Sequence, residues 1–128
     1  MRLLLDTHAL YWWLEDQQRL SPNARGAIGA VDSEVYVSIA SAWEMAIKVG
    51  AGKWAAAALF VDNFGDQAAA EDFRILAISL AHVRAAGLMQ SHHRDPFDRL
   101  LVAQAQIEGL SPVTADPKLT GLGATIVW

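Results

Sequence analysis

The stretch Leu3-Leu4-Leu5-Asp6-Thr7-His8-Ala9-Leu10 begins as an apolar run, changes to an acid at Asp6 and continues as a helix-like segment. The same change recurs three more times along the chain. Glu44 follows Val35-Tyr36-Val37-Ser38-Ile39, Asp98 lies near the start of FDRLLVAQAQI (97–107), and Asp116 follows Pro112-Val113-Thr114. If the apolar runs are parallel strands, these acids meet along one edge of the sheet, where open α/β folds bind their ligands.

The composition is typical of one compact domain spanning residues 1–128. A hydrophobic share of 53% with five tryptophans excludes a disordered chain. The chain has no cysteine, which excludes disulfides and thiolate metal sites. Met1-Arg2 precedes only three leucines, too few for a signal-peptide core, and no apolar run of about 18 residues is present. We therefore expect a cytoplasmic protein without a membrane segment.

The net charge of −4 is unusual for a nucleic-acid-binding protein. It comes from fourteen acidic and ten basic residues, so without the four junction acids the two signs balance. A bound divalent cation reverses the local field at a carboxylate cluster. Net charge alone therefore does not exclude a phosphate-rich substrate.

Apolar runs and helix signals alternate along the whole chain. The expected strands are 2–5, 34–39, 73–78, 112–115 and 125–128, and the expected helices are 8–15, 22–31, 42–49, 54–70, 80–90 and 96–108. This order predicts an α/β domain with a parallel, about five-stranded sheet and helices on both faces.

Several helix boundaries have specific signals. Ser21-Pro22 and Asp95-Pro96 each supply a cap followed by proline at the first helical position, and Gly109 stops the second of these helices. The pattern Ser41-Ala-Trp-Glu44 predicts a capping box for helix 42–49. Gly65 is the expected break in the alanine-rich segment 54–70.

Each junction acid also has an ordinary structural explanation. Asp6 and Asp116 can cap helices, Glu44 can close its capping box or pair with Lys48, and Asp98 follows the Asp95 cap. For any one of them, capping is the better reading. Four caps on one sheet edge are less easily explained, and carboxylates gathered there repel one another unless a cation such as Mg²⁺ binds them. The four histidines do not form a metal-ligand pattern, and His93 more readily fixes the turn before Asp95.

The chain resembles the PIN domain family, specifically the VapC-type toxins of type II toxin–antitoxin systems. The resemblance is carried by LLLDTHALYW (3–12), SIASAWEMAIKVGAGK (38–53), HRDPFDRLLVAQA (93–105) and, more weakly, VTADPKL (113–119). It implies a PIN-like nuclease domain that hydrolyses RNA internally with Mg²⁺ or Mn²⁺. The family's acidic cluster corresponds here to Asp6, Glu44, Asp98 and Asp116, whereas Asp95 is better explained as a helix cap.

The resemblance also implies roles for these acids and their neighbours. Asp6 and Asp98 would be the principal ligands, Glu44 would bind the metal or orient water, and Asp116 would complete the site or hold a second ion. Further residues near the motifs are expected to contact RNA, although solvated surface charge is the alternative for the basic ones: Thr7, Lys48, Lys53, Arg94, Arg99 and Thr114. The implied partners are RNA, a cognate antitoxin and a second copy of the chain.

The apolar run Leu10-Tyr11-Trp12-Trp13-Leu14 goes all the way round a helix. One sheet face cannot cover all of it, which predicts an association surface around Tyr11, Trp12 and Trp13. The alternative is a helix buried between elements of its own chain. Trp54 and Phe60 have the same two interpretations.

The acid pattern also bears on three other functions. A haloacid-dehalogenase-type phosphatase needs a second acid two residues after Asp6, where this chain has His8. A receiver domain needs an acid after a middle strand, where this chain has Ile78-Ser79. The remaining alternative is a catalytically inactive PIN-like module that binds RNA or protein.

Overall fold

The computed structural model describes residues 1–128 and contains one four-stranded sheet. The strands are β1 (Arg2–Leu5), β2 (Glu34–Ser38), β3 (Arg74–Leu76) and β4 (Ser111–Val113). They are all parallel and lie in the order β3-β2-β1-β4. The predicted α/β architecture is therefore confirmed, and the carboxyl ends of all four strands lie at one edge of the sheet.

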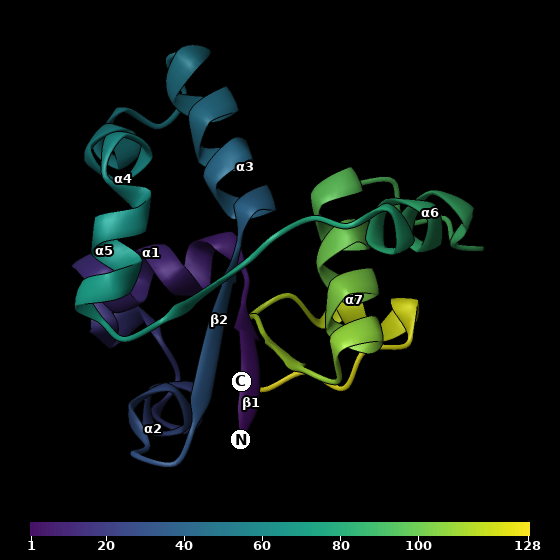
Figure 1. Ribbon diagram of the computed structural model, residues 1–128, viewed down its shortest axis with the longest axis horizontal. Helices are drawn as coiled ribbons and strands as arrows, with labels where there is room; N and C mark the ends of the chain where they lie inside the picture. Colours follow the sequence, from purple (N-terminus) through teal and green to yellow (C-terminus); the bar gives the residue numbers. More distant parts are fainter.

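Helices cover both faces of this sheet, as Figure 1 shows. The α-helices are α1 (Thr7–Glu15), α2 (Pro22–Gly29), α3 (Ile39–Gly50), α4 (Ala58–Asp62), α5 (Phe64–Ala70), α6 (Leu80–Leu88) and α7 (Pro96–Glu108). The short 3-10 helices are η1 (Gln17–Arg19), η2 (Ala55–Ala57) and η3 (Pro117–Leu122). Helices α1, α2, α4 and α5 lie on one side and α6 and α7 on the other, while α3 extends from the carboxyl end of β2. None of these helices is long and apolar enough to cross a bilayer.

The leucines of β1 explain why the opening run is uninterrupted. Leu3 and Leu5 belong to the core beneath α1, whereas Leu4 packs on the opposite face with Leu101 and Val102 of α7. All three leucines are fully buried. A strand covered on both faces needs apolar residues at every position, and alternation would leave a polar side chain in one core.

The expected fifth strand, 125–128, is reduced to a single parallel bridge between Val127 and Val113. The backbone nevertheless remains at the sheet edge, because the Val127 amide donates to Pro112 and the Thr114 amide to Val127. The predicted third strand is likewise shorter than 73–78 and comprises Arg74–Leu76. The sheet thus has four strands and one bridged segment.

The predicted capping box at Ser41 and Glu44 is wrong. Helix α3 begins at Ile39, and its cap is Ser38, whose Oγ accepts from the Ala40 amide over 3.0 Å. The hydroxyl of Ser38 also donates to Gln104 of α7 over 2.6 Å. The helix therefore follows β2 without a loop, which buries Ser41 and places Glu44 in the second turn.

Of the other helix signals, those at the two ends of α7 are confirmed and the one at Gly65 is wrong. Asp95 caps α7 and Gly109 ends it in a left-handed conformation (φ 67°), as predicted. The segment 54–70 is interrupted at Asn63, not at Gly65, and its first residues form η2. Asn63 has a non-helical backbone conformation, and its side chain donates to the carbonyl of Leu59.

The aromatic residues of α1 are partly exposed and partly packed against the core. Tyr11, Trp12 and Trp13 are partly buried and pack against the core. Tyr11 contacts Trp54 and Phe60, Trp12 contacts Trp128, and the indole N–H of Trp13 donates to Glu71 over 3.0 Å. Helix α1 thus has contacts with its own chain on several sides, and the association surface around Tyr11, Trp12 and Trp13 stays a prediction.

Candidate functional site

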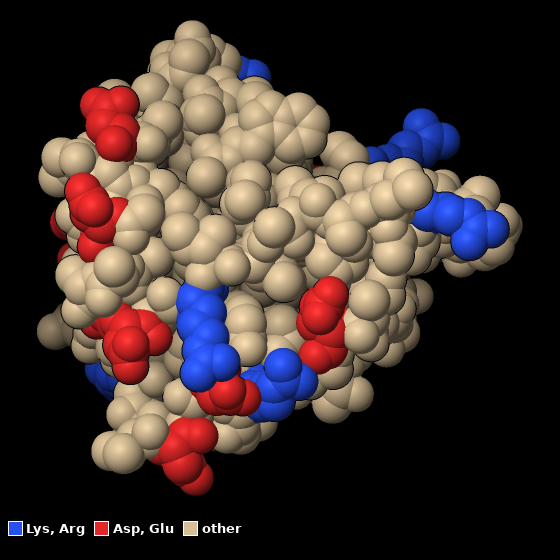
Figure 2. Space-filling model, in the orientation of Figure 1, with Lys and Arg blue, Asp and Glu red and all other residues tan.

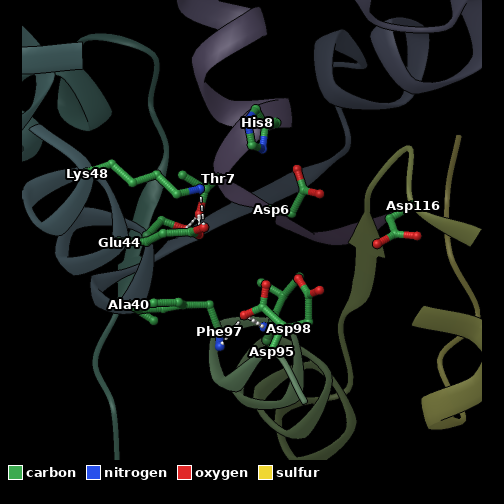
Figure 3. A pocket seen from close by; sticks show the side chains of 12 residues that line it. Asp6, Thr7, His8, Ala40, Glu44, Lys48, Asp95, Phe97, Asp98 and Asp116 are labelled. Atoms are coloured by element: carbon green, nitrogen blue, oxygen red, sulfur yellow. Dashed lines mark hydrogen bonds and ion pairs between the residues drawn. The ribbon is translucent and has the colours of Figure 1, made fainter. Parts of the chain in front are cut away.

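A pocket of about 200 Å³ lies at the carboxyl edge of the sheet. Figure 3 shows Asp6, Glu44, Asp98 and Asp116 around this opening, each from a different element. They come from the end of β1, the second turn of α3, the first turn of α7 and the loop after β4. All four acids named from the sequence therefore line a single pocket, hereafter the carboxylate pocket, together with Asp95.

Asp6 is held by the helix that it caps. Its Oδ1 accepts from the Ala9 amide over 2.7 Å, at the amino end of α1. Burial raises the pKa of Asp6 above its ordinary value, and the charge of Asp98 raises it further. The Thr114 hydroxyl, the Ala9 amide and His8 lower this pKa without cancelling the rise. Burial therefore makes the ionisation of Asp6 less favourable than it is in water, and a nearby positive charge would offset that cost.

Glu44 is fixed by one donor on each carboxylate oxygen. Thr7 Oγ1 donates to Oε1 over 2.6 Å, and Lys48 Nζ donates to Oε2 over 2.9 Å. The side chain of Glu44 is only 14% exposed. Thr7 also lies 3.0 Å from the buried Ser41 Oγ. Thr7 and Lys48, both predicted to contact RNA, are thus engaged in positioning Glu44.

Asp98 is paired with His93, which the sequence had predicted only to fix the turn before Asp95. His93 Nε2 lies 2.8 Å from Asp98 Oδ2, so His93 contacts the carboxylate directly. Burial raises the pKa of Asp98, the His93 contact lowers it, and the charges of Asp95 and Asp116 raise it. Asp95 caps α7 by accepting from the Phe97 amide over 2.9 Å, which confirms its predicted capping role.

Asp116 is positioned by the loop after β4. Its Oδ1 accepts from the Lys118 amide over 2.9 Å and caps η3. Its own amide donates to Thr114 Oγ1 over 3.1 Å. Thr114 is fully buried and hydrogen-bonds to Asp6 and to the Asp116 amide. It is therefore not accessible to RNA in this structure, although contact with RNA was expected for it.

The structure divides the predicted basic residues into two groups. Arg99 donates from its guanidinium to the backbone carbonyls of Ala86, Met89 and His93, so its expected role in RNA contact is not supported. Arg94 and Lys53 are exposed on the surface. Arg94 lines a shallow pocket that also contains Asp98 and Asp116.

Sequence reasoning did not assign His8 or Lys118 to this region. His8 lines the carboxylate pocket, and Lys118 lines the neighbouring pocket with Arg94. Their places inside the motifs DTH and DPK were the available signal.

The donor chemistry of the carboxylate pocket fits a hard divalent cation, because carboxylate oxygens face it and no sulfur or unpaired imidazole cluster does. No three Asp, Glu or His side chains come close enough together to form a complete metal site. The four acids line one pocket, and their role as a metal-ligand set stays a prediction. Mg²⁺ commonly binds through one or two carboxylates and keeps several waters, which suits this spacing.

Comparisons with known proteins agree with this architecture. The sequence model of the PIN domain family matches residues 3–123. Ribonuclease VapC22 of Mycobacterium tuberculosis is 35% identical over 118 residues, which covers 91% of this chain and 88% of that protein.

Solved structures show the same fold at low sequence identity. The structure of VapBC2 from Rickettsia felis, bound to a DNA fragment from its promoter, matches with a TM-score of 0.67 and 14% identity, covering 98% of this chain and 96% of that chain. FitAcB from Neisseria gonorrhoeae matches with a TM-score of 0.62 and 18% identity over the same shares. The family match over nearly the whole chain, with the 35% identical relative, shows that this chain belongs to the PIN domain family.

Proposed function

We propose that this protein is a metal-dependent endoribonuclease and the toxin of a toxin–antitoxin pair, with residues 1–128 as its nuclease domain. The observation that carries the proposal is the convergence of Asp6, Glu44, Asp98 and Asp116 on one pocket. The 35% identical relative is named a ribonuclease, which supports RNA as the substrate. In this proposal the protein acts in the cytoplasm.

Asp6 and Asp98 are the proposed principal metal ligands, with Mg²⁺ or Mn²⁺ as the ion. Their raised pKa values reflect a cost of ionisation that a cation would offset. Asp116 would complete the site or hold a second ion. A divalent ion in this pocket would stabilise negative charge on the scissile phosphate and lower the pKa of a water molecule.

Glu44 is the proposed group that orients the attacking water. Thr7 and Lys48 hold both of its oxygens, so its carboxylate has a defined direction towards the pocket. Hydrolysis forms a bond from the water oxygen to phosphorus and breaks the bond to the leaving ribose oxygen, which receives a proton. Lys48 carries a positive charge beside this position and would help to neutralise the phosphate.

We further propose that the protein assembles with a cognate antitoxin and with a second copy of itself. The solved relatives include a toxin–antitoxin complex from Klebsiella pneumoniae, with a TM-score of 0.53 and 18% identity, which supports an antitoxin partner. One candidate association surface is the expected one at Tyr11, Trp12 and Trp13, whose side chains are only partly buried against the core.

The apolar residues that remain exposed lie on α3 and α6. Ile39, Trp43 and Ile47 are four residues apart, so they share one face of α3. On α6 the exposed apolar residues are Leu80, Val83 and Leu88. A groove of about 240 Å³ runs between Trp43 and Val83. Figure 2 shows a broad uncharged area over the region where Figure 1 places α3, which is suited to association.

The test of the catalytic proposal is cleavage of RNA by the purified protein. We expect internal cuts that need Mg²⁺ or Mn²⁺, that stop with EDTA and that disappear in Asp98→Asn. Asp95→Asn is the matched control, because Asp95 lines the same pocket but caps a helix, and asparagine also caps. Cutting that persists in EDTA, or that survives Asp98→Asn, would contradict the proposal.

A non-catalytic PIN-like module that binds RNA or protein is the second candidate. The observation in its favour is that no three Asp, Glu or His side chains come together as a metal site. Such a module would bind RNA without cutting it at any Mg²⁺ or Mn²⁺ concentration. The same cleavage assay therefore separates the two candidates.

A further inference from the structure

A second pocket, of about 310 Å³, adjoins the carboxylate pocket. It is lined by His8, Lys48, Lys53 and Trp54, hereafter the basic-aromatic pocket. His8 and Lys48 line both pockets, so the two adjoin at these side chains. Figure 3 shows these two side chains along the same rim of the carboxylate pocket. A chain-like ligand held in the carboxylate pocket would therefore have the basic-aromatic pocket as its neighbour on the side of His8 and Lys48.

The aromatic rings of the basic-aromatic pocket are stacked. The imidazole of His8 lies on the indole of Trp54, with ring centroids 5.2 Å apart and an interplanar angle of 20°. Tyr11 contacts Trp54 at a centroid distance of 4.9 Å. Lys48 Nζ lies 5.7 Å from the centroid of the Trp54 ring. Trp54 is thus fixed by several neighbours and supports the exposed ring of His8.

The charge of this pocket contrasts with that of the chain. The chain has a net charge of −4, yet the lining of the basic-aromatic pocket contains two lysines and no acid. Lys48 is paired with Glu44. Lys53 is exposed and forms none of the ion pairs in the structure, whereas Arg2, Arg19 and Arg74 are all paired. Lys53 is therefore available to a phosphate.

We propose that the basic-aromatic pocket is a nucleotide subsite that holds single-stranded RNA beside the carboxylate pocket. A base stacks on the His8 ring that Trp54 supports, and Lys53 contacts the adjacent phosphate. Exposed aromatic rings with neighbouring cations are the usual means of binding unpaired bases and their backbone. The bases of a duplex are stacked within the helix and cannot use such a ring. This subsite rests on the proposed ribonuclease function and adds to it a binding site and a strand preference.

The test is the binding of a short fluorescein-labelled single-stranded RNA of mixed sequence, measured by anisotropy over a range of salt concentrations. Ca²⁺ is present throughout, because it takes the same oxygen ligands as Mg²⁺. The variants are Lys53→Ala, His8→Ala and His8→Phe. Arg84→Ala is the matched control, since Arg84 is an exposed, unpaired cation on α6 that lines neither pocket.

The two parts of the subsite have different expected signatures. Removing one phosphate contact with Lys53→Ala should reduce the slope of log affinity against log salt by about 0.7. His8→Ala should weaken binding by about tenfold at an unchanged slope, because a stacked base carries no released ion. His8→Phe keeps a ring and should bind as the wild type does, and Arg84→Ala should change affinity by less than about twofold.

Three results would overturn the subsite. They are unchanged affinity and slope in both Lys53→Ala and His8→Ala, a loss in Arg84→Ala equal to that in Lys53→Ala, or equal affinity for the duplex of the same sequence. Circular dichroism of each variant shows whether the fold is retained. The proposed function fails separately: a wild type that never cuts RNA refutes the nuclease, whereas unchanged binding in the variants of a cutting enzyme refutes only the subsite.

Discussion

Thr7 Oγ1 donates a hydrogen bond of 2.6 Å to Glu44 Oε1 and so joins the first turn of α1 to the second turn of α3. The two residues are 37 positions apart in the chain. Lys48 donates to the other oxygen of Glu44 from one helical turn further along α3. The direction of the Glu44 carboxylate is therefore set by contacts between two helices that each follow a parallel strand.

We expect Thr7→Val to reduce RNA cleavage by about tenfold or more, because second-layer hydrogen bonds to site carboxylates commonly have effects of that size. The loss of a buried hydrogen bond should also lower the free energy of unfolding by about 1–2 kcal/mol. Thr7→Ser keeps the hydroxyl and should restore cleavage. The measurements are cleavage rates and urea unfolding of both variants. If Thr7→Ser is as impaired as Thr7→Val, the hydroxyl does not position Glu44.

Asp6→Asn should weaken Mn²⁺ binding, measured by calorimetry. The substitution removes the charge but retains an oxygen that can cap the Ala9 amide, so the fold should survive. Asp95→Asn provides the comparison and should leave Mn²⁺ affinity closer to that of the wild type. Equal affinity in Asp6→Asn and the wild type would remove Asp6 from the ligand set.

The buried carboxylates predict a specific dependence of stability on pH in EDTA. Folding raises the pKa of Asp6 and of Asp98, mainly through burial. Between the unfolded and the folded pKa of each group, the folded protein binds more protons than the unfolded chain, so its stability falls as the pH rises through that interval. Asp6→Asn lacks the contribution of Asp6.

The wild type should therefore lose stability relative to Asp6→Asn as the pH rises from acid to neutral. Urea unfolding of both proteins across this range measures the difference. Mn²⁺ at neutral pH should stabilise the wild type more than Asp6→Asn, because a ligand stabilises most the protein that binds it most tightly. A difference that stays constant with pH would show that folding does not perturb Asp6.

Arg99 is expected to be a residue of the fold. It donates to the carbonyls of Ala86, Met89 and His93, and so ties the end of α6 and the following loop to α7. Arg99→Ala should lower the free energy of unfolding by about 2–4 kcal/mol, because it leaves these carbonyls without their charged donor. Arg99→Lys should restore little, since an ammonium group cannot reproduce the planar fork. Thermal or urea unfolding tests both, and full rescue by lysine would contradict this reading.

Trp43→Ala should weaken assembly with the antitoxin or a second copy, as measured by light scattering, with little effect on stability. Leu59→Ala is the matched control, because Leu59 on α4 is 59% exposed and Trp43 is 58% exposed. Trp13→Ala should instead cost stability, by about 3 kcal/mol, because Trp13 packs against the core. Normal assembly of Trp43→Ala, or weaker assembly of Leu59→Ala by the same amount, would place the interface elsewhere.

Local signals in the sequence were sufficient for much of the fold. The uninterrupted leucines of β1 predicted a short strand at 2–5, and Asp95-Pro96 with Gly109 predicted both ends of α7. The alternation of strands and helices predicted a parallel sheet, and hence that the acids after its strands would meet at one edge. These features depend on a few neighbouring residues, or on the fact that parallel strands all end at the same edge of a sheet.

The sequence by itself thus determined the α/β architecture and the four acids that line the carboxylate pocket. Only the tertiary structure decided what each side chain contacts. Ser38 and not Ser41 caps α3, the guanidinium of Arg99 donates to backbone carbonyls, and the aromatic run of α1 packs partly against its own core. The physical reason is that caps, ion pairs and burial depend on which partners long-range packing brings near, and that packing is not encoded in local spacing.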